Sequence, residues 1–305
     1  MFPLRLGTRG SPLALTQANM VAGALRAVHG WDEQAIEIVA IRTSGDRIQD
    51  RALADVGGKA LWTKELDRAL FAGEIDFAVH SMKDVETIRP DGIVIAAMLP
   101  RADVRDRLIG AETVASLGQG ARIGTSSPRR AAQLRRLRPD LSITLFRGNV
   151  DTRLRKLAEG EADATLLAAA GLDRLGRADI GHAIPIETML PAPAQGAVGI
   201  ETLAANAETR RLLAAIDHAE THRCVAVERA FLAALGADCR SPVAALAVEE
   251  EAGAIHLRAE LLGEQGEMHV AGEARFASDD QAAPGALGRD LLARAAPALR
   301  ALFAG

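Results

Sequence analysis

Short apolar runs along the chain alternate with longer segments in which apolar residues recur every three or four positions. The short runs are typical of buried strands, and the longer segments are typical of amphipathic helices. In the first 200 residues, strands are predicted at 5–8, 36–41, 75–79, 93–98, 122–124, 142–146, 164–167 and 196–200. Helices are predicted at 13–28, 60–72, 129–137 and 150–159. This alternation of strands and helices indicates the α/β class.

One strand-turn-helix pattern occurs twice. Residues 5–12 and 122–128 each contain a strand, a Gly-Thr turn, a serine that can cap the next helix and a proline suited to the first helical position. Residues 73–78 and 160–165 are also similar, since each is a helix end that leads into a strand. Two matching segments in the same order predict two lobes built on one plan. Chance similarity between two such units is the alternative.

The two lobes differ in the length of chain between these matching segments. The interval is longer in the first lobe, from Gly7 to Gly73, than in the second, from Gly124 to Gly160. The surplus includes the polar segment 42–59. We expect this segment to be a long mobile loop.

Proline-containing segments suggest how the domains are connected. Linkers at 99–103 and 191–193 flank the second lobe. The chain would therefore leave the first lobe, build the second and return, as in a hinged clamp. After residue 217 the pattern predicts a small α+β domain, with elements at 219–235, 243–248, 255–262, 268–276 and 287–303. The expected domains are 1–99 with 196–217, then 103–191, and finally 218–305.

Composition narrows the function. The chain has 305 residues, 49% of them hydrophobic and 25% charged, which is typical of a globular protein with more than one domain. A net charge of −4, no tyrosine and only 3% aromatic residues argue against a nucleic-acid-binding protein. The N-terminus lacks the pattern of a signal peptide, and no run is long and apolar enough to span a membrane. The expected compartment is the reducing cytoplasm.

The strand at 75–79 ends in an abrupt cluster of polar residues: His80, Ser81, Lys83 and Asp84. Ligands bind at the carboxyl ends of strands in α/β sheets, because the helices leave a crevice there. Lys83 and Asp84 could place a cation and an acid/base group over one small molecule. The alternative is that both are solvated loop charges.

The second lobe concentrates arginine. Arg129 and Arg130 fall in the first turn of a helix, where cations are unfavourable unless an anion lies close by. Arg147 directly follows a strand, and Arg9 with Ser11 occupies the equivalent end in the first lobe. Arginine suits carboxylates and phosphates, so these residues predict an anion-binding cleft. A solvated basic helix face is the alternative, and it is our interpretation for Arg135, Arg136 and Arg138.

The cysteines and histidines show no disulfide or metal-site spacing. Cys239 lies between Asp238 and Arg240 in a loop, where a neighbouring cation favours the thiolate, although an inert thiol is also consistent with this setting. Cys224 lies within an amphipathic helix and is interpreted as a core residue. No metal site is expected from the scattered residues His29, His80 and His182.

These motifs together resemble the porphobilinogen deaminase family, also called hydroxymethylbilane synthase. The segments Val-His-Ser-Met-Lys-Asp at 79–84 and Gly-Thr-Ser-Ser-Pro-Arg-Arg at 124–130 are the most specific, and the similarity extends from Arg5 to about Arg275. The resemblance implies two type II periplasmic-binding-protein-like lobes with mixed sheets and a small α+β C-terminal domain. It also implies a transferase that joins four porphobilinogen molecules, with release of ammonia, into hydroxymethylbilane.

The resemblance further implies a dipyrromethane cofactor, joined by a thioether to Cys239, and a catalytic carboxylate at Asp84. The cofactor-binding positions of the family fall on Lys83, Ser126, Ser127, Arg129, Arg130, Arg147, Gln195 and Gly196. The substrate-binding positions fall on Arg9, Ser11, Gln17, Thr125, Arg147, Arg153 and Arg174.

The sequence departs from the family pattern in a few places. Asp238 precedes the cysteine, where glycine is common, and Asp55 replaces a basic residue in the 42–59 loop. Trp62 replaces a more usual phenylalanine. The competing hypothesis is a cytoplasmic two-lobe ligand-binding or sensor protein without catalysis. Retention of both Asp84 and Cys239 favours the enzyme, which we expect to be a monomer that hands its product to the next enzyme.

Overall fold

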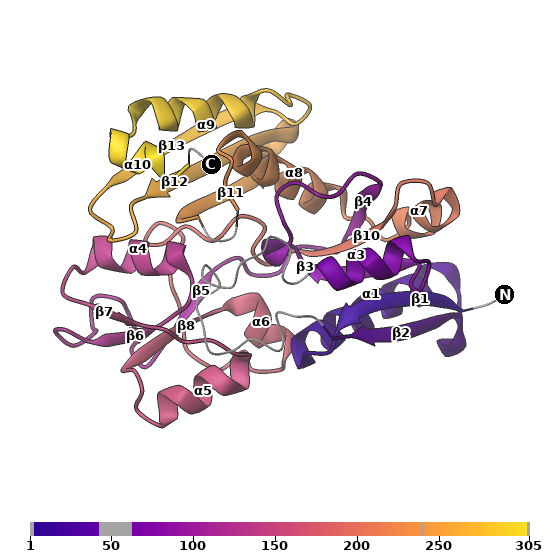
Figure 1. Cartoon of the computed structure of the whole chain (residues 1–305), viewed down its shortest axis with the longest axis horizontal. Coiled ribbons are helices and arrows are strands. Elements are labelled where there is room, and N and C mark those ends of the chain that lie inside the picture. Colours follow the sequence, from indigo (N-terminus) through magenta and orange to yellow (C-terminus); the bar gives the residue numbers. More distant parts are fainter. Residues whose placement is uncertain (1–2, 43–62, 239–240, 304–305) are drawn as a thin grey trace. The chain divides into compact units, whose positions relative to one another are not determined.

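The computed structural model describes residues 3–42, 63–238 and 241–303 (Figure 1). Most of the expected loop at 42–59, together with Asp55, Trp62 and Cys239, lies outside the described residues. The described chain divides into two compact units. Unit 1 comprises residues 3–42, 63–102 and 196–222, and unit 2 comprises 103–195 and 223–303. Among these residues, no helix combines the length and apolar character needed to cross a membrane.

Unit 1 is a five-stranded mixed sheet with the strand order β2-β1-β3-β10-β4. The strands β1, β2 and β3 run parallel, and β10 is antiparallel to both β3 and β4. Leu6, Leu25, Phe77 and Val198 are fully buried in its core. The strands are β1 (Leu4–Arg9), β2 (Ile36–Ile41), β3 (Phe77–Ser81), β4 (Ile93–Met98) and β10 (Val198–Leu203). The helices are α1 (Pro12–His29), η1 (Glu33–Ala35), α3 (Lys64–Phe71), η2 (Met82–Asp84) and α7 (Ala207–Ala214).

Unit 2 contains a second five-stranded mixed sheet, with the order β7-β6-β8-β5-β9. Here β6 is parallel to β7 and β8, and β5 is antiparallel to β8 and β9. The strands are β5 (Asp106–Ile109), β6 (Arg122–Gly124), β7 (Ser142–Thr144), β8 (Ala164–Ala168) and β9 (His182–Ala183). The helices are α4 (Pro128–Leu137), α5 (Val150–Ala158) and α6 (Ala169–Arg174).

The two sheets confirm the prediction of two lobes on one plan. Their strand orders and directions correspond, with β1 matching β6 and β3 matching β8. The local contacts correspond as well: the backbone N–H groups of Arg5 and Arg122 donate to Asp76 and Asp163, each at 2.7 Å. Chance similarity of two isolated units would not reproduce the same register and the same side-chain anchors.

Unit 2 also contains the expected small α+β fold at the C-terminal end of the chain. Its antiparallel sheet is formed by β11 (Val243–Glu249), β12 (Ala254–Leu262) and β13 (His269–Ala277), with η3 (Glu251–Gly253) between the first two strands. The helices are α8 (Ala219–Ala234), α9 (Ala283–Arg294) and α10 (Pro297–Ala301). The prediction of a single helix at 287–303 is therefore wrong, because Ala295 is extended and ends α9, and Pro297 then begins α10.

The α/β class with mixed sheets is confirmed. The boundaries proposed for the three domains stay a prediction, as does the hinged clamp.

Within unit 2, helix α4 is fastened to the hairpin between β12 and β13. The amide of Gln133 donates to Glu260 and to the carbonyl of Leu190, both at 3.0 Å. In the hairpin turn, Gly266 has φ +81° and lies so close to α4 that a Cβ would come within 2.6 Å of the backbone of Ala132. Only glycine allows this close approach of two backbones.

We expect Gly266→Ala to destabilise the protein more than Gly160→Ala. Both glycines have positive φ, so both substitutions incur the left-handed backbone cost of about 1–2 kcal/mol. Only the alanine at 266 also meets backbone atoms, which adds about 1–3 kcal/mol of overpacking. Urea denaturation of the two variants measures the difference. Equal losses would show that the hairpin can move away from α4 at no cost.

Candidate functional site

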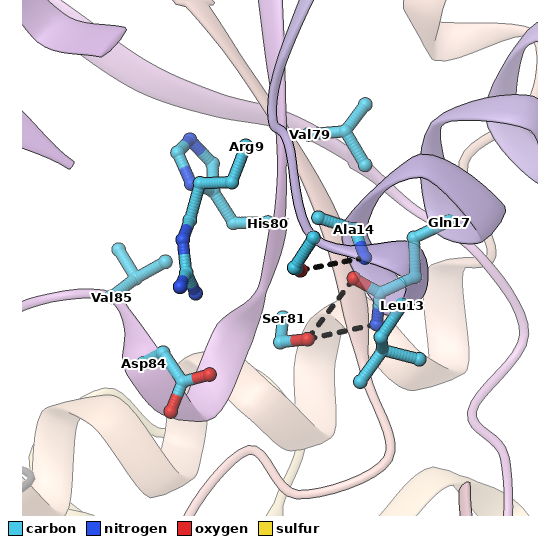
Figure 2. Close-up of a pocket in the computed structure, with 10 residues that line it drawn as sticks. Arg9, Leu13, Ala14, Gln17, Val79, His80, Ser81, Asp84 and Val85 are labelled. Carbon is cyan, nitrogen blue, oxygen red and sulfur yellow. Dashed lines mark hydrogen bonds between the residues drawn. The ribbon is translucent and has the colours of Figure 1, made fainter. Parts of the chain in front are cut away.

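The carboxyl end of β3 opens into a pocket of about 60 Å³ in unit 1 (Figure 2). Four predicted site residues meet there, although they come from two distant parts of the chain. The lining consists of Arg9, Ser11, Leu13, Ala14, Gln17, Val79, His80, Ser81, Asp84 and Val85. The strand-end rule therefore located the pocket correctly.

Local structure fixes how these side chains are presented. Ser11 caps α1 by accepting from the backbone of Ala14 at 3.3 Å. Buried Gln17 is hydrogen-bonded to Ser81, with 2.8 Å between Nε2 and Oγ. Figure 2 shows the Arg9 side chain extending toward Asp84 from the opposite wall. The pocket thus combines a cation, a carboxylate and neutral hydrogen-bonding groups.

The helical turn η2 carries both Lys83 and Asp84. Its start is fixed to the residue that precedes β10, because the N–H of Met82 donates to the carbonyl of Ala197 at 3.1 Å. A Cβ at Gly199 would lie 2.1 Å from the sulfur of Met82, so a larger residue on β10 would displace the buried Met82 side chain. Asp84 lines the pocket and stays half-exposed, which suits a carboxylate that meets a ligand. Lys83 is half-exposed on the same turn.

A second group of predicted residues follows β6 in unit 2. Thr125 is buried and accepts from the N–H of Ser127 at 3.2 Å. Ser127 caps α4 by accepting from the N–H of Arg130 at 3.4 Å. Arg153 reaches from α5 to Ser126, with 3.4 Å between Nη2 and Oγ. These hydroxyl groups and the start of α4 provide hydrogen-bond donors for an anion.

Three predicted arginines lie after the ends of β7 and β8. Arg147 is 7% exposed and is followed by Gly148, whose φ of +104° allows the turn into α5. Arg153 donates to the carbonyl of Gly148 at 3.0 Å. Arg174 ends α6, and burial lowers its pKa despite the neighbouring Asp173. Three cations thus follow the strands of this sheet along the chain, and their role in binding an anion stays a prediction.

The structure supplies the anion that the sequence required at the start of α4. Asp106, on β5, accepts from Arg129 at 2.8 Å and from Arg130 at 2.7 Å. It also accepts from the amide of Gln195 at 2.9 Å. These groups are 1–5% exposed. We name Asp106, Arg129 and Arg130 the buried triad.

The triad is held in its charged form by its own geometry. Burial alone would raise the pKa of Asp106, but Arg129 and Arg130 outweigh burial and lower it far below its usual range. Burial also lowers the pKa of Arg129, and Asp106 opposes that change. One carboxylate thus compensates two cations, which leaves the triad with a net positive charge. The Nε–H of Arg130 is buried without a hydrogen-bond partner in the part of the chain that the structure describes.

Sequence reasoning missed Asp106. Its strand is only four residues long, and Arg105 and Arg107 on either side make it resemble a surface segment. The signal that could have found it was the need for an anion beside two arginines in the first turn of a helix.

Two of the three arginines interpreted as a solvated face are bonded to other segments. Arg135 is half-exposed and donates to the carbonyl of Glu264 at 2.9 Å. Arg138 bonds to Asp140 at 2.7 Å and to the carbonyls of Val114, Leu117 and Gly118, so it closes the end of α4 against the preceding loop. The solvated interpretation of Arg138 is therefore wrong. Arg136 is exposed, as expected.

The remaining residues singled out in the sequence are Gly196 and the two cysteines. Gly196 is buried in unit 1 and its carbonyl accepts from Ala102 at 3.2 Å. Cys224 is 4% exposed within α8, which confirms that it is a core residue. Cys239 lies outside the described residues, so its role stays a prediction.

Comparison with known proteins identifies the family of the chain. Residues 4–211 match the family model "Porphobilinogen deaminase, dipyromethane cofactor binding domain". Residues 222–296 match "Porphobilinogen deaminase, C-terminal domain". A porphobilinogen deaminase of Sphingopyxis alaskensis is 61% identical over 307 aligned residues, which cover 99% of this chain and 97% of the relative. One of Paracoccus denitrificans is 49% identical over 297, covering 96% and 95%.

Solved structures with a related arrangement are much more distant. The VFT2 domain of Bordetella pertussis BvgS is 14% identical with a TM-score of 0.41, covering 74% of this chain and 91% of that domain. Immunogenic lipoprotein A from Vibrio vulnificus is 12% identical with a TM-score of 0.41, covering 72% and 96%.

We expect Asp106→Asn to be strongly destabilising, because it leaves two buried guanidinium groups without a counter-charge. Loss of one partner of a buried ion pair costs about 3–5 kcal/mol. Since the folded state lowers the pKa of Asp106, its contribution is present above the ordinary aspartate pKa of about 3.9 and is lost as the pH falls further. The difference in unfolding free energy between wild type and variant should therefore shrink in acid.

The matched control is Asp163→Asn, which weakens the exposed pair with Arg122 and should change stability little. Chemical denaturation between neutral pH and pH 3 measures both variants. If the two substitutions cost the same at neutral pH, Asp106 is not the essential counter-charge of the two arginines.

Proposed function

We propose a division of labour for this chain, which belongs to the porphobilinogen deaminase family, between one carboxylate in unit 1 and a set of cations in unit 2. The chain is a transferase that condenses four porphobilinogen molecules, with release of ammonia, into the linear tetrapyrrole hydroxymethylbilane, and it uses a dipyrromethane cofactor. The observation that carries the proposal is the convergence of Asp84, Arg9, Ser11 and Gln17 on one pocket.

Asp84 is the proposed catalytic residue. Loss of ammonia from porphobilinogen leaves an electron-poor methylene-pyrrole, whose ring nitrogen becomes acidic and carries developing positive charge. A fixed carboxylate stabilises this charge and can accept or return the ring proton. Asp84 suits the role because it lines the pocket on a short turn that is anchored at Met82.

Carboxylate recognition is the proposed role of the arginines. Each porphobilinogen unit contributes an acetate and a propionate, so the growing product adds two negative charges per ring. Arginine binds carboxylates through two parallel hydrogen bonds. Arg9, Ser11 and Gln17 in unit 1 would bind substrate, as would Thr125, Arg147, Arg153 and Arg174 in unit 2.

The residues present also fit the cofactor. Its side-chain carboxylates require donors, and the region after β6 offers the hydroxyls of Ser126 and Ser127, a helix start and the net positive buried triad. The unpaired Nε–H of buried Arg130 is one such donor. Proposed contacts to the cofactor are Lys83, Ser126, Ser127, Arg129, Arg130, Arg147, Gln195 and Gly196, with Cys239 as the covalent attachment. When bound, the cofactor supplies the pyrrole end to which substrate units are added.

The side chain of Arg129 is bonded mainly to the protein itself. Its Nη1 donates to Gln133 and to the carbonyl of Leu190, both at 2.9 Å, and its Nη2 donates to Asp106. We infer that Arg129 acts mainly by fixing the start of α4 and by contributing charge. We also infer that the protein works in the cytoplasm as a monomer and passes its product to the next enzyme.

We expect Asp84→Asn to keep the fold and much of the substrate affinity but to lower turnover by several orders of magnitude. The amide has the same size, but it cannot balance developing positive charge. Asp91→Asn is the control, since Asp91 is an exposed carboxylate in the same segment. Steady-state kinetics and circular dichroism test both variants. Turnover of Asp84→Asn comparable to that of the control would remove Asp84 from its proposed role.

We expect the purified protein to exceed the mass of its sequence by two linked pyrrole units, on the peptide that contains Cys239. A thioether forms when a thiolate adds to an electrophilic carbon, and it is stable where disulfides are reduced. Cys239→Ser should lack the added mass and be inactive. Cys224→Ser, which alters a buried core thiol, should keep both the added mass and activity.

Intact-protein and peptide mass spectrometry give the answer. A wild-type protein that remains unmodified after incubation with porphobilinogen would favour the sensor hypothesis over the enzyme. Added mass on another peptide would place the attachment elsewhere.

A further inference from the structure

A cluster of buried charges lies beside the segment that carries Asp84. Its centre is Arg89, whose side chain is 7% exposed. We name it the Arg89 cluster, and it consists of Thr63, Asp67, His80, Glu86, Arg89 and Glu201. Only His80 also lines the pocket, and the proposed reaction uses none of the others.

The guanidinium of Arg89 is saturated. It has five N–H groups, and it makes five hydrogen bonds. Nε and Nη2 bind the two oxygens of Glu201 at 2.7 and 2.9 Å, in the parallel geometry that arginine forms with carboxylates. Nη2 also binds Asp67 at 2.5 Å, and Nη1 binds Glu86 at 2.6 Å and Thr63 at 3.3 Å.

These bonds join the catalytic segment to the rigid part of unit 1. Residues 82–92 connect β3 to β4, but β10 lies between these two strands in the sheet. Because both strands are antiparallel to β10, they are parallel to each other, so the connection runs from beside the start of β10 to beside its end. Glu201 lies on β10 and Asp67 lies on α3, whereas Glu86 and Arg89 belong to the connection itself. Arg89 thus ties the connection to a strand and to a helix.

The ion pairs of Arg89 with Glu201 on β10 and with Asp67 on α3 make the attachment of the connection strong. Burial alone would raise the pKa of Glu201, but His80 and Arg89 lower it to about 2. Burial raises the pKa of Asp67 even though Arg89 lies against it. Glu201 is fully buried. If Arg89 moved away, the carboxylate of Glu201 would lose its bidentate partner in a low-dielectric interior, which is costly.

We propose that Arg89 is a positioning residue for Asp84, and that it acts by fixing the 82–92 segment to β10 and α3. The inference rests on the proposed catalytic role of Asp84. The start of the segment is anchored through the backbone of Met82, and Arg89 anchors its far part. Asp84 lies between these two anchors, so its carboxylate is held on both sides along the chain.

Stability alone does not explain the cluster. Well-packed apolar residues usually replace a buried ion cluster without loss of stability, so a purely structural demand would not select five directional bonds. A catalytic carboxylate does demand fixed geometry, since a displacement of about 1 Å can reduce a rate about 100-fold. Lysine can replace the charge but not the full set of bonds, because it has three donors and no planar fork.

The test compares Arg89→Leu with Arg5→Leu, each measured as the cofactor-loaded protein. Arg5 forms the ion pair with Asp76 at the opposite end of the same sheet, away from the pocket residues, so it controls for loss of an arginine–carboxylate pair in unit 1. We expect Arg89→Leu to lower kcat about 10- to 100-fold with less than about a threefold change in KM, whereas Arg5→Leu should keep wild-type kcat. Arg89→Lys should recover only part of the loss.

Hydrogen exchange provides a readout that does not depend on turnover. Amides of residues 82–92 should exchange faster in Arg89→Leu than in wild type and be unchanged in Arg5→Leu. Wild-type exchange or a wild-type kcat in Arg89→Leu would overturn the proposal. If Asp84→Asn itself turns over normally, the catalytic role of Asp84 fails, and positioning of Asp84 for catalysis fails with it, even where exchange shows that Arg89 fixes the segment.

Discussion

Two guanidinium groups are buried at the start of a helix, which is unfavourable unless an anion lies beside them, and one carboxylate supplies that anion. Helix starts repel cations, and burial removes the water that would solvate them. Asp106 answers both problems, because it bonds Arg129, Arg130 and Gln195 at once. Because β5 pairs with β8, it places Asp106 beside the start of α4, and the net charge of the buried triad there is positive.

The same lobe plan is used twice with opposite chemical results. In unit 1 the strand β3 ends in a turn that presents the carboxylate of Asp84, whereas in unit 2 the matching strand β8 leads into α6 and Arg174. Both lobes share a left-handed glycine, a serine that caps a helix and an aspartate that accepts from a strand N–H, since these groups serve the scaffold. The pairs are Gly73 and Gly160, Ser11 and Ser127, and Asp76 and Asp163. The residues that follow each strand are not shared, and these are the residues that we propose to contact the ligand. A repeated scaffold would therefore allow one lobe to supply the carboxylate and the other to supply cations.

The sequence was informative wherever a local rule decides the structure. Apolar periodicity located the main strands and helices, and the strand-end rule located the pocket with Asp84. It failed where a residue's role depends on contacts distant in sequence. Asp106 lies on a strand too short to show an apolar pattern. Arg138 was interpreted as solvated, because the sequence does not show that it binds carbonyls of the loop at 114–118. Arg89 was overlooked for the same reason, because Ile88-Arg89-Pro90-Asp91 resembles an exposed turn.

Counting donors gives a physical way to sort the arginines of this protein. A guanidinium has five N–H groups, and each one bonded to the protein is no longer available to a carboxylate ligand. In Arg89 all five N–H groups are hydrogen-bonded to residues of unit 1. The donors of Arg138 bind Asp140 and loop carbonyls. Such residues fix backbone. Arg129 and Arg130 differ, since both are buried and charge-compensated but the Nε–H of each has no hydrogen-bond partner within the described residues. Burial and charge alone therefore do not mark a binding arginine, and its hydrogen bonds to the protein must be counted as well.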